Sequence, residues 1–99
     1  MYEIEYAEGV TDDLRRLRAH ERKRILDTIE EQLNHQPMQG TRNKKPLMGL
    51  KPPWDRDEPV WELRIGIYRV FYEVDEAGQR VVVHAVRRKP PHQTTEEIL

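Results

Sequence analysis

Two arginines in a predicted β-hairpin are the first residues in this chain whose spacing points to chemistry. Residues 60–74, VWELRIGIYRVFYEV, alternate apolar and polar side chains on both sides of Gly66, which is the pattern of two half-buried strands. Glycine suits the first position of a type II′ turn, because that position requires a positive φ. The resulting register places Arg64 opposite Arg69 on one face. Like charges in facing positions destabilise a sheet, so the pair indicates a site that binds an anion.

Further basic residues lie on either side of this hairpin. The net charge of −1 argues against simple electrostatic capture of nucleic acid, but a local basic patch binds phosphate even on a near-neutral protein. The loop before the hairpin contains Arg42 and Arg56 as well as Trp54. Basic residues around an aromatic ring can form a surface that binds phosphate and stacks on bases. Alternatively, Trp54 only packs the loop against the core. The candidate phosphate-binding residues are Lys44, Lys45 and Lys51 in the loop, and Arg87, Arg88 and Lys89 at the end of the last strand.

The elements before the hairpin follow from periodicity and from helix start signals. Residues 2–7 alternate as a short strand, and Thr11 followed by Asp12 has the composition of a capped helix start. Residues 20–33 carry apolar side chains at four-residue spacing, which predicts a second helix. The sequence leaves open whether these two helices are continuous.

The elements after the second helix are predicted in the same way. Residues 38–59 contain several prolines and glycines and no predicted element. Residues 80–88 form the last strand, and consecutive prolines then end sheet pairing. Residues 90–99 are a polar tail, in which Thr94 or Thr95 is placed to cap a final turn.

The order β-α-α-β-β-β predicts an α+β fold, with two N-terminal helices packed on a small, mostly antiparallel sheet. Residues 1–99 are expected to form a single domain. The chain contains no cysteine, which excludes disulfides and thiolate metal sites. It shows neither a secretory signal nor an apolar run of about 20 residues that would span a bilayer. We therefore expect a soluble, cytoplasmic protein that does not act at a membrane.

Two stretches carry a resemblance to a known family. Residues 45–50 read KPLMGL, and residues 61–72 read WELRIGIYRVFY. A short strand and two helices precede these stretches, and a strand with a basic end follows them. In this order, nearly the whole chain resembles the RelE/ParE superfamily of type II toxin–antitoxin toxins. The resemblance implies a RelE-like microbial RNase fold. RNA-cleaving and gyrase-targeting members share this framework, and the RelE-like branch is favoured.

The resemblance implies cleavage of messenger RNA in the ribosomal A site without a metal or other cofactor. The ribose 2′-OH attacks the adjacent phosphate and leaves a 2′,3′-cyclic phosphate and a free 5′-OH. The protein must therefore remove the proton of the 2′-OH, protonate the leaving oxygen and stabilise the added charge on the phosphate. By resemblance, Arg69 is the transition-state arginine, and Arg64 contacts phosphate or assists proton transfer. Arg88 and Lys89 match basic residues at the end of the last strand.

The group that accepts the proton must be something other than an arginine, because arginine stays protonated. Family members often carry a tyrosine or a His-Tyr pair after the basic strand end, whereas this chain has His92. His92 is a candidate general acid or base, because an unperturbed imidazole has a pKa of about 6.5; otherwise it is an exposed tail residue. Glu62, on the strand face of Arg64, is the alternative base, unless it only neutralises Arg64 or Arg69.

Three functions therefore compete. The leading hypothesis is an endoribonuclease toxin that inhibits translation; the others are a ParE-type gyrase-inhibiting toxin without catalysis and a catalytically degenerate member that only binds its partner. Arg64, Arg69 and the basic cluster at 87–89 favour the nuclease, while the missing C-terminal tyrosine favours the others. Each implies a cognate antitoxin that covers or distorts the arginine face, singly or in a higher-order complex.

Overall fold

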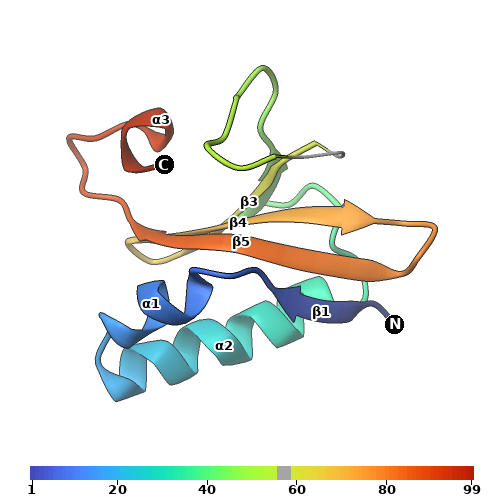
Figure 1. The fold of residues 1–99 in the computed structure, drawn as a ribbon, viewed down its shortest axis with the longest axis horizontal. Coiled ribbons are helices and arrows are strands. Elements are labelled where there is room, and N and C mark those ends of the chain that lie inside the picture. Colours follow the sequence, from blue (N-terminus) through green and yellow to red (C-terminus); the bar gives the residue numbers. More distant parts are fainter. Residues whose placement is uncertain (56–58) are drawn as a thin grey trace.

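A computed structural model of the chain describes residues 1–55 and 59–99, so Arg56 of the basic loop lies outside the described residues. The fold is a five-stranded sheet with two helices on one face and a short C-terminal helix on the other (Figure 1). The elements are β1 (Glu3–Tyr6), α1 (Val10–Arg15), α2 (Ala19–Leu33), β2 (Lys44–Pro46), β3 (Trp61–Ile65), β4 (Tyr68–Asp75), β5 (Arg80–Arg88) and α3 (Thr95–Ile98). The predicted α+β fold is confirmed, with one further strand and one further helix. No helix in the described part of the chain is long and apolar enough to cross a bilayer.

The sheet brings the first strand beside the last. Its order is β1-β5-β4-β3-β2. β1 runs parallel to β5, from Glu3 opposite Arg80 to Tyr6 opposite Val83, and the remaining pairs are antiparallel. The long strands β4 and β5 therefore form the centre of the sheet, and the hairpin of β3 and β4 lies next to the basic end of β5.

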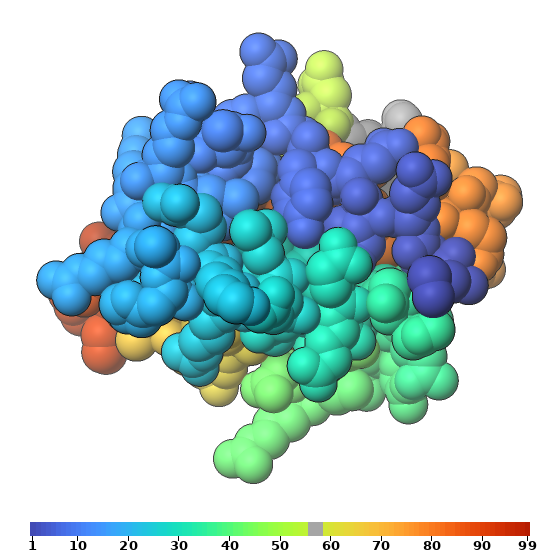
Figure 2. Space-filling view, turned by 90° about the horizontal axis from the view of Figure 1, so that it is seen from below, coloured from blue at the N-terminus to red at the C-terminus, as the bar shows by residue number. Residues whose placement is uncertain are grey.

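The helices α1 and α2 cover one face of the sheet (Figures 1 and 2). Ile25, Ile29 and Leu33, at four-residue spacing on α2, are buried in one cluster with Val70 and Tyr72 of β4. Burying each such aliphatic side chain contributes about 1.5–3 kcal/mol. The Tyr72 hydroxyl donates a hydrogen bond across this core to a loop carbonyl at 2.6 Å, and burial raises the pKa of its phenol. This face is therefore the main core.

The hairpin has the predicted register. Ile65 lies opposite Tyr68, and Arg64 lies opposite Arg69. Gly66 has a φ of +59°, a conformation that glycine adopts without the steric cost of a side chain. The turn therefore aligns the two arginines as the sequence pattern indicates.

Two local predictions are wrong, and one open question is settled. Gly9, with a φ of +98°, is the N-cap residue of α1, so Thr11 lies within the first turn and does not cap it. Residues 38–59 do contain an element, because Lys44–Pro46 forms β2 and pairs with β3. The two helices are separate, since Arg18 is extended before α2 begins.

Asp13 on α1 completes the edge of β5. Its Oδ2 accepts a hydrogen bond from the backbone N–H of Val86 at 3.1 Å and one from Arg87 Nη1 at 2.5 Å. Because β1 pairs with β5 only as far as Val83, this carboxylate supplies an acceptor that a strand neighbour would otherwise provide. An acidic residue placed at the positive end of the helix dipole thus also joins α1 to the sheet.

The second face of the sheet carries a smaller apolar cluster. It consists of Val60, Phe71 and Ala85, with Leu47, Trp54, Ile98 and Leu99 packed against it. The polar tail forms α3, capped by Thr94, whose side chain accepts from the N–H of Glu97 while the Glu97 side chain accepts from the N–H of Thr94. The end of the chain is therefore fixed against the sheet by a capping box and two apolar residues.

Trp54 is held in this second layer by two partners. Its ring stacks on His84 with the centroids 4.8 Å apart, and its Nε1 donates to Glu73 at 3.1 Å. The same carboxylate lies 2.5 Å from His84 Nε2. Burial lowers the pKa of His84 and outweighs the opposing effect of Glu73. These contacts favour the packing role for Trp54 over base stacking.

Acidification is expected to weaken this second layer. Because the pKa of folded His84 lies below its usual value of about 6.5, the unfolded chain takes up the proton first, so stability is present above that pH and falls as the pH drops through it. The measurement is the urea midpoint by tryptophan fluorescence near pH 7.5 and near pH 5.5. His84→Gln should flatten this dependence, whereas His20→Gln on the exposed start of α2 should retain it. Equal pH dependence in wild type and His84→Gln would contradict the interpretation.

Candidate functional site

A groove on the sheet face opposite α1 and α2 collects most of the predicted catalytic residues. It has a volume of 170 Å³. Its lining residues are Arg42, Asn43, Lys45, Glu62, Arg64, Arg69, Lys89 and Thr95. They come from the loop before β2, from β2, β3 and β4, from the residue after β5 and from the first residue of α3, so the groove exists only in the folded chain. We call it the Glu62–Arg69 groove.

A buried ion pair lies at the bottom of this groove. Arg69 Nε is 3.7 Å from Glu62 Oε1, and the two side chains are 7% and 6% exposed. Two further groups reach the same carboxylate: Thr95 Oγ1 donates to Oε1 at 3.1 Å, and Lys45 Nζ lies 3.8 Å from Oε2. Charged groups buried to this extent require such partners, because desolvation is costly.

The guanidinium of Arg69 is anchored on its other side by the hairpin turn. Its Nη1 donates to the carbonyl oxygens of Gly66 at 2.9 Å and Tyr68 at 2.8 Å. Burial lowers the pKa of Arg69, the charge of Arg64 lowers it further, and Glu62 raises it. Arginine nevertheless stays protonated at neutral pH. The facing arginines are therefore tolerated because Glu62 compensates one of them, while Arg64 remains exposed in the groove.

Lys44 does not fit the phosphate-binding role assigned to it. It is buried, and its Nζ donates to the carbonyl oxygens of Gln32 at 3.1 Å and Gln36 at 3.0 Å. These carbonyls lie at and just beyond the end of α2, where backbone acceptors need partners. Burial also lowers the pKa of this lysine. Lys44 therefore caps a helix, while its neighbour Lys45 points to the opposite face and lines the groove.

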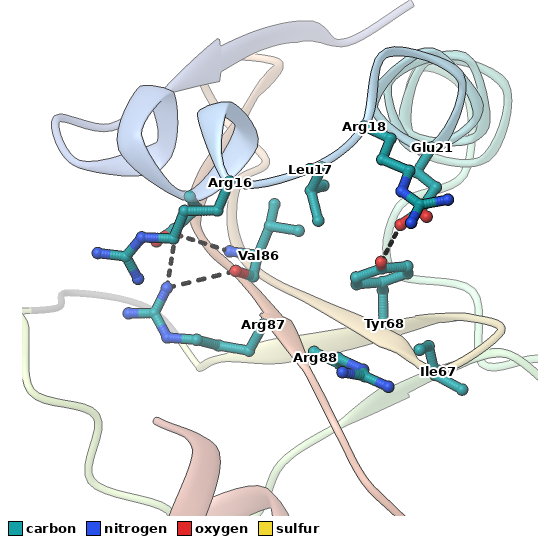
Figure 3. A pocket seen from close by; sticks show the side chains of 10 residues that line it. Arg16, Leu17, Arg18, Glu21, Ile67, Tyr68, Val86, Arg87 and Arg88 are labelled. Atoms are coloured by element: carbon teal, nitrogen blue, oxygen red, sulfur yellow. Dashed lines mark hydrogen bonds and ion pairs between the residues drawn. The ribbon is translucent and has the colours of Figure 1, made fainter.

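The basic end of β5 is divided between the two faces of the sheet. Lys89 lines the Glu62–Arg69 groove. Arg88 faces the helices with Tyr68, and it lines with Arg87 a groove of 580 Å³ between the α1–α2 connection and the ends of β4 and β5 (Figure 3). We call this the helix-side groove. Arg87 is already paired with Asp13 there. Arg88 therefore lies apart from the ion pair, whereas Arg87 is opposite Arg69 in the register of β4 and β5 and directs its guanidinium to Asp13.

Two further predicted residues lie away from the ion pair. Lys51 lines a separate hollow with Glu96 and Leu99. His92 is exposed in the turn before α3, and it is not among the described residues that line the Glu62–Arg69 groove. Of the two candidate proton acceptors, the structure therefore places only Glu62 beside Arg69.

Sequence reasoning missed Asn43 and Thr95 as site residues. The backbone carbonyl of Asn43 accepts a hydrogen bond from the backbone N–H of Arg64 at 2.8 Å and extends the β2–β3 pairing. The composition of this loop does not indicate a strand. The sequence pattern predicts only a capping role for Thr95. One of the two consecutive threonines is enough to cap α3. The hydroxyl of the other is then left to bond elsewhere, and this was the feature of the sequence that could have pointed to Thr95. Within the described residues, no group of three or more His, Cys, Asp or Glu side chains is placed to hold a metal ion.

Several solved structures share this fold. The chain resembles the RelBE2 toxin–antitoxin complex of Mycobacterium tuberculosis (22% identity, TM-score 0.69, covering 89% of this chain and 98% of that chain). It also resembles the archaeal RelE–RelB complex of Pyrococcus horikoshii (21%, 0.70, 94% and 98%) and the isolated E. coli RelE toxin (18%, 0.69, 98% and 94%). The fold is that of the small toxins of toxin–antitoxin modules.

The family follows from the sequence profile. The profile of the ParE toxin of the type II toxin–antitoxin system, parDE, matches residues 4–89. The chain belongs to this ParE toxin family, within the RelE/ParE superfamily, and the resemblance noted from its motifs is confirmed. No curated protein sequence matches it.

The buried pair should show strong energetic coupling. Arg69→Met is expected to destabilise the protein by about 3 kcal/mol, because it leaves the Glu62 carboxylate buried without its neighbouring guanidinium. The double variant Glu62→Gln/Arg69→Met should cost less than the sum of the single variants by at least about 1 kcal/mol. Urea unfolding of the four proteins measures this coupling. The exposed Arg64→Met is the control and should cost less than Arg69→Met; strict additivity at Glu62 and Arg69 would contradict the pairing.

Proposed function

We propose that this type II toxin is an endoribonuclease that cleaves messenger RNA and thereby inhibits translation. The observation that carries the proposal is the buried Glu62–Arg69 pair, which opens into a groove with Arg64, Lys45 and Lys89. A carboxylate beside several fixed cations supplies a proton acceptor next to a site for an anionic phosphate. These are the elements that transesterification of an RNA phosphodiester requires.

The proposed reaction is carried out by side chains alone. Glu62 takes the proton of a ribose 2′-OH, and the 2′-oxygen forms a bond to the adjacent phosphorus. Arg69 and Arg64 stabilise the negative charge that develops on the phosphate oxygens. The bond from phosphorus to the 5′-oxygen breaks, and Lys89 protonates the leaving oxygen. The products are a 2′,3′-cyclic phosphate and a 5′-OH.

Glu62 is preferred to His92 as base because it lies in the groove, where Thr95 orients one of its oxygens. The remaining oxygen, Oε2, faces Lys45 at 3.8 Å. This is longer than a hydrogen bond, and the oxygen is available to accept a substrate proton. An ammonium group gives up a proton more readily than a guanidinium does, which favours Lys89 as the acid.

We further propose that cleavage takes place on the ribosome, in the A site, and in the cytoplasm. The groove has a volume of only 170 Å³, so it offers little surface to orient a whole RNA strand. An RNA held by the ribosome would need only its scissile phosphate presented to Arg69. The partner proposed for the toxin when it is not on the ribosome is a cognate antitoxin, since several of the similar structures are toxin–antitoxin complexes.

A second candidate is a gyrase-inhibiting toxin without catalysis. One observation favours it: the matching family profile is that of ParE toxins. In this case the Glu62–Arg69 pair would be structural, and the cationic groove would be part of a binding surface.

Cleavage of a reporter mRNA in a purified translation reaction, mapped by primer extension, tests the proposal. Wild-type toxin should give discrete cuts, and Glu62→Gln should slow cutting by about 100-fold or more because it removes the general base. His92→Gln should cut as wild type does, and the exposed Lys23→Gln on α2 is the matched control. Intact mRNA together with trapped gyrase–DNA complexes would establish the second candidate instead. If neither occurs with folded protein, the toxin only binds its partner.

Thr95 is expected to act on the reaction through Glu62. Thr95→Val removes the hydroxyl that holds Oε1 and should lower kcat by about tenfold with little change in KM, because substrate binding by the arginines is untouched. Thr95→Ser keeps the hydroxyl and should restore kcat. Equal losses in the Val and Ser variants would show that the residue serves only to pack α3.

A further inference from the structure

A further groove lies next to the Glu62–Arg69 groove, between the loop after β2 and α3. These two segments lie on the same side of the sheet (Figure 1). The groove is lined from β2 and this loop by Pro46, Leu47, Met48 and Leu50, and from the end of the chain by Thr94 and Glu96. We call it the Met48–Glu96 groove. Its volume of 530 Å³ is in the range of sites that bind small ligands.

The two grooves adjoin each other at the proposed general base. Lys45 and Thr95 line both of them. Lys45 Nζ lies 3.8 Å from Glu62 Oε2, and Thr95 Oγ1 donates to Glu62 Oε1 at 3.1 Å. Because Glu62 takes the proton of the attacking 2′-OH in the proposed reaction, the ribose that carries this hydroxyl lies beside Lys45 and Thr95. The Met48–Glu96 groove is therefore the space next to the base of that nucleotide.

The lining of this groove suits an uncharged ring better than a second phosphate. Met48 is 85% exposed, and Leu47 and Leu50 are partly exposed, so apolar side chains are available to cover the face of a ring. A thioether makes favourable contacts with aromatic rings. The groove also contains the carboxylate of Glu96, which repels a phosphate. Enzymes bind unstacked bases in this way, with apolar side chains on the ring face and hydrogen bonds on the Watson–Crick edge.

The carboxylate of Glu96 decides which base fits. Glu96 is exposed and forms no ion pair with another of the described residues, so both of its oxygens are open to a ligand. A carboxylate only accepts hydrogen bonds. Guanine places two donors, N1–H and N2–H, side by side on its Watson–Crick edge, and they match the two oxygens. Adenine, cytosine and uracil each place an acceptor next to their single donor group, and a carboxylate repels that acceptor.

We propose that the Met48–Glu96 groove binds the base on the 5′ side of the scissile phosphate and that it selects guanine. Glu96 accepts the two donors of the guanine edge, and Met48 and Leu50 contact the face of the ring. The proposal rests on the endoribonuclease function proposed above. The expected product is an RNA fragment that ends in guanosine 2′,3′-cyclic phosphate.

Binding of short RNA oligonucleotides, measured by fluorescence anisotropy, tests the subsite independently of cleavage. Four oligonucleotides carry guanine, adenine, cytosine or uracil at one position between flanking uridines. Their riboses carry 2′-fluorine in place of the 2′-OH, so none can attack a phosphate. The wild-type toxin should bind the guanine oligonucleotide at least about tenfold more tightly than the other three, which is the discrimination that a bidentate contact to a base provides.

Glu96→Gln should abolish this preference, because an amide replaces one acceptor by a donor. The ratio of affinities is the readout, since loss of a negative charge alone changes the binding of all four oligonucleotides equally. Glu31→Gln on the exposed side of α2, with the same change in charge, is the matched control and should keep the preference. In spectra of toxin with labelled methionine methyl groups, the guanine oligonucleotide should shift the Met48 signal more than the Met38 signal. Unchanged urea midpoints establish that the variants are folded.

The results separate failure of the subsite from failure of the nuclease. Equal binding of the four oligonucleotides by wild type, no binding of any of them, or a guanine preference that Glu96→Gln retains would overturn the subsite. Primer extension on mRNA then tests cleavage separately, and cuts with no guanine on their 5′ side would likewise reject the subsite while the nuclease stands. A guanine preference that depends on Glu96, together with intact mRNA, would confirm base binding in the groove and reject the proposed reaction.

Discussion

Burying the guanidinium of Arg69 is the constraint on which the outer face of the sheet depends. A charge removed from water needs a counterion and hydrogen-bond acceptors, since desolvation otherwise exceeds the electrostatic gain. Glu62 supplies the counterion at 3.7 Å, and the carbonyls of Gly66 and Tyr68 supply the acceptors. Glu62 in turn is reached by Lys45 from β2 and by Thr95 from α3. The edge strand and the C-terminal helix are thus tied to one ion pair.

The same hairpin turn borders both grooves. On one face, Gly66 and Tyr68 hold Arg69 through their carbonyls; on the other, Tyr68 and Ile67 line the helix-side groove. Strand alternation places consecutive side chains on opposite faces, which separates a basic strand end into Arg88 on the helix side and Lys89 beside the ion pair. Two grooves therefore lie within a few residues of each other without sharing side chains.

The sheet, the helical pair and the hairpin provide the fold shared with RelE toxins, and fold alone does not decide activity. The C-terminal tail of this chain forms α3, and the hydroxyl of Thr95 in α3 donates to the Glu62 carboxylate. The proposed chemistry accordingly uses Glu62 on the sheet, which a strand holds more rigidly than a tail holds a histidine.

The sequence by itself determined the α+β class, the hairpin register and the opposition of Arg64 and Arg69, because strand alternation and a glycine turn are local properties. It did not reveal β2, since three residues in a proline-rich loop become a strand only when β3 pairs with them. Nor did it separate Lys44 from Lys45: equal in chemistry and adjacent in sequence, they have different roles because one faces the end of α2 and the other faces Glu62. Tertiary structure decided which charges meet, because burial and partners are set by segments distant in the chain.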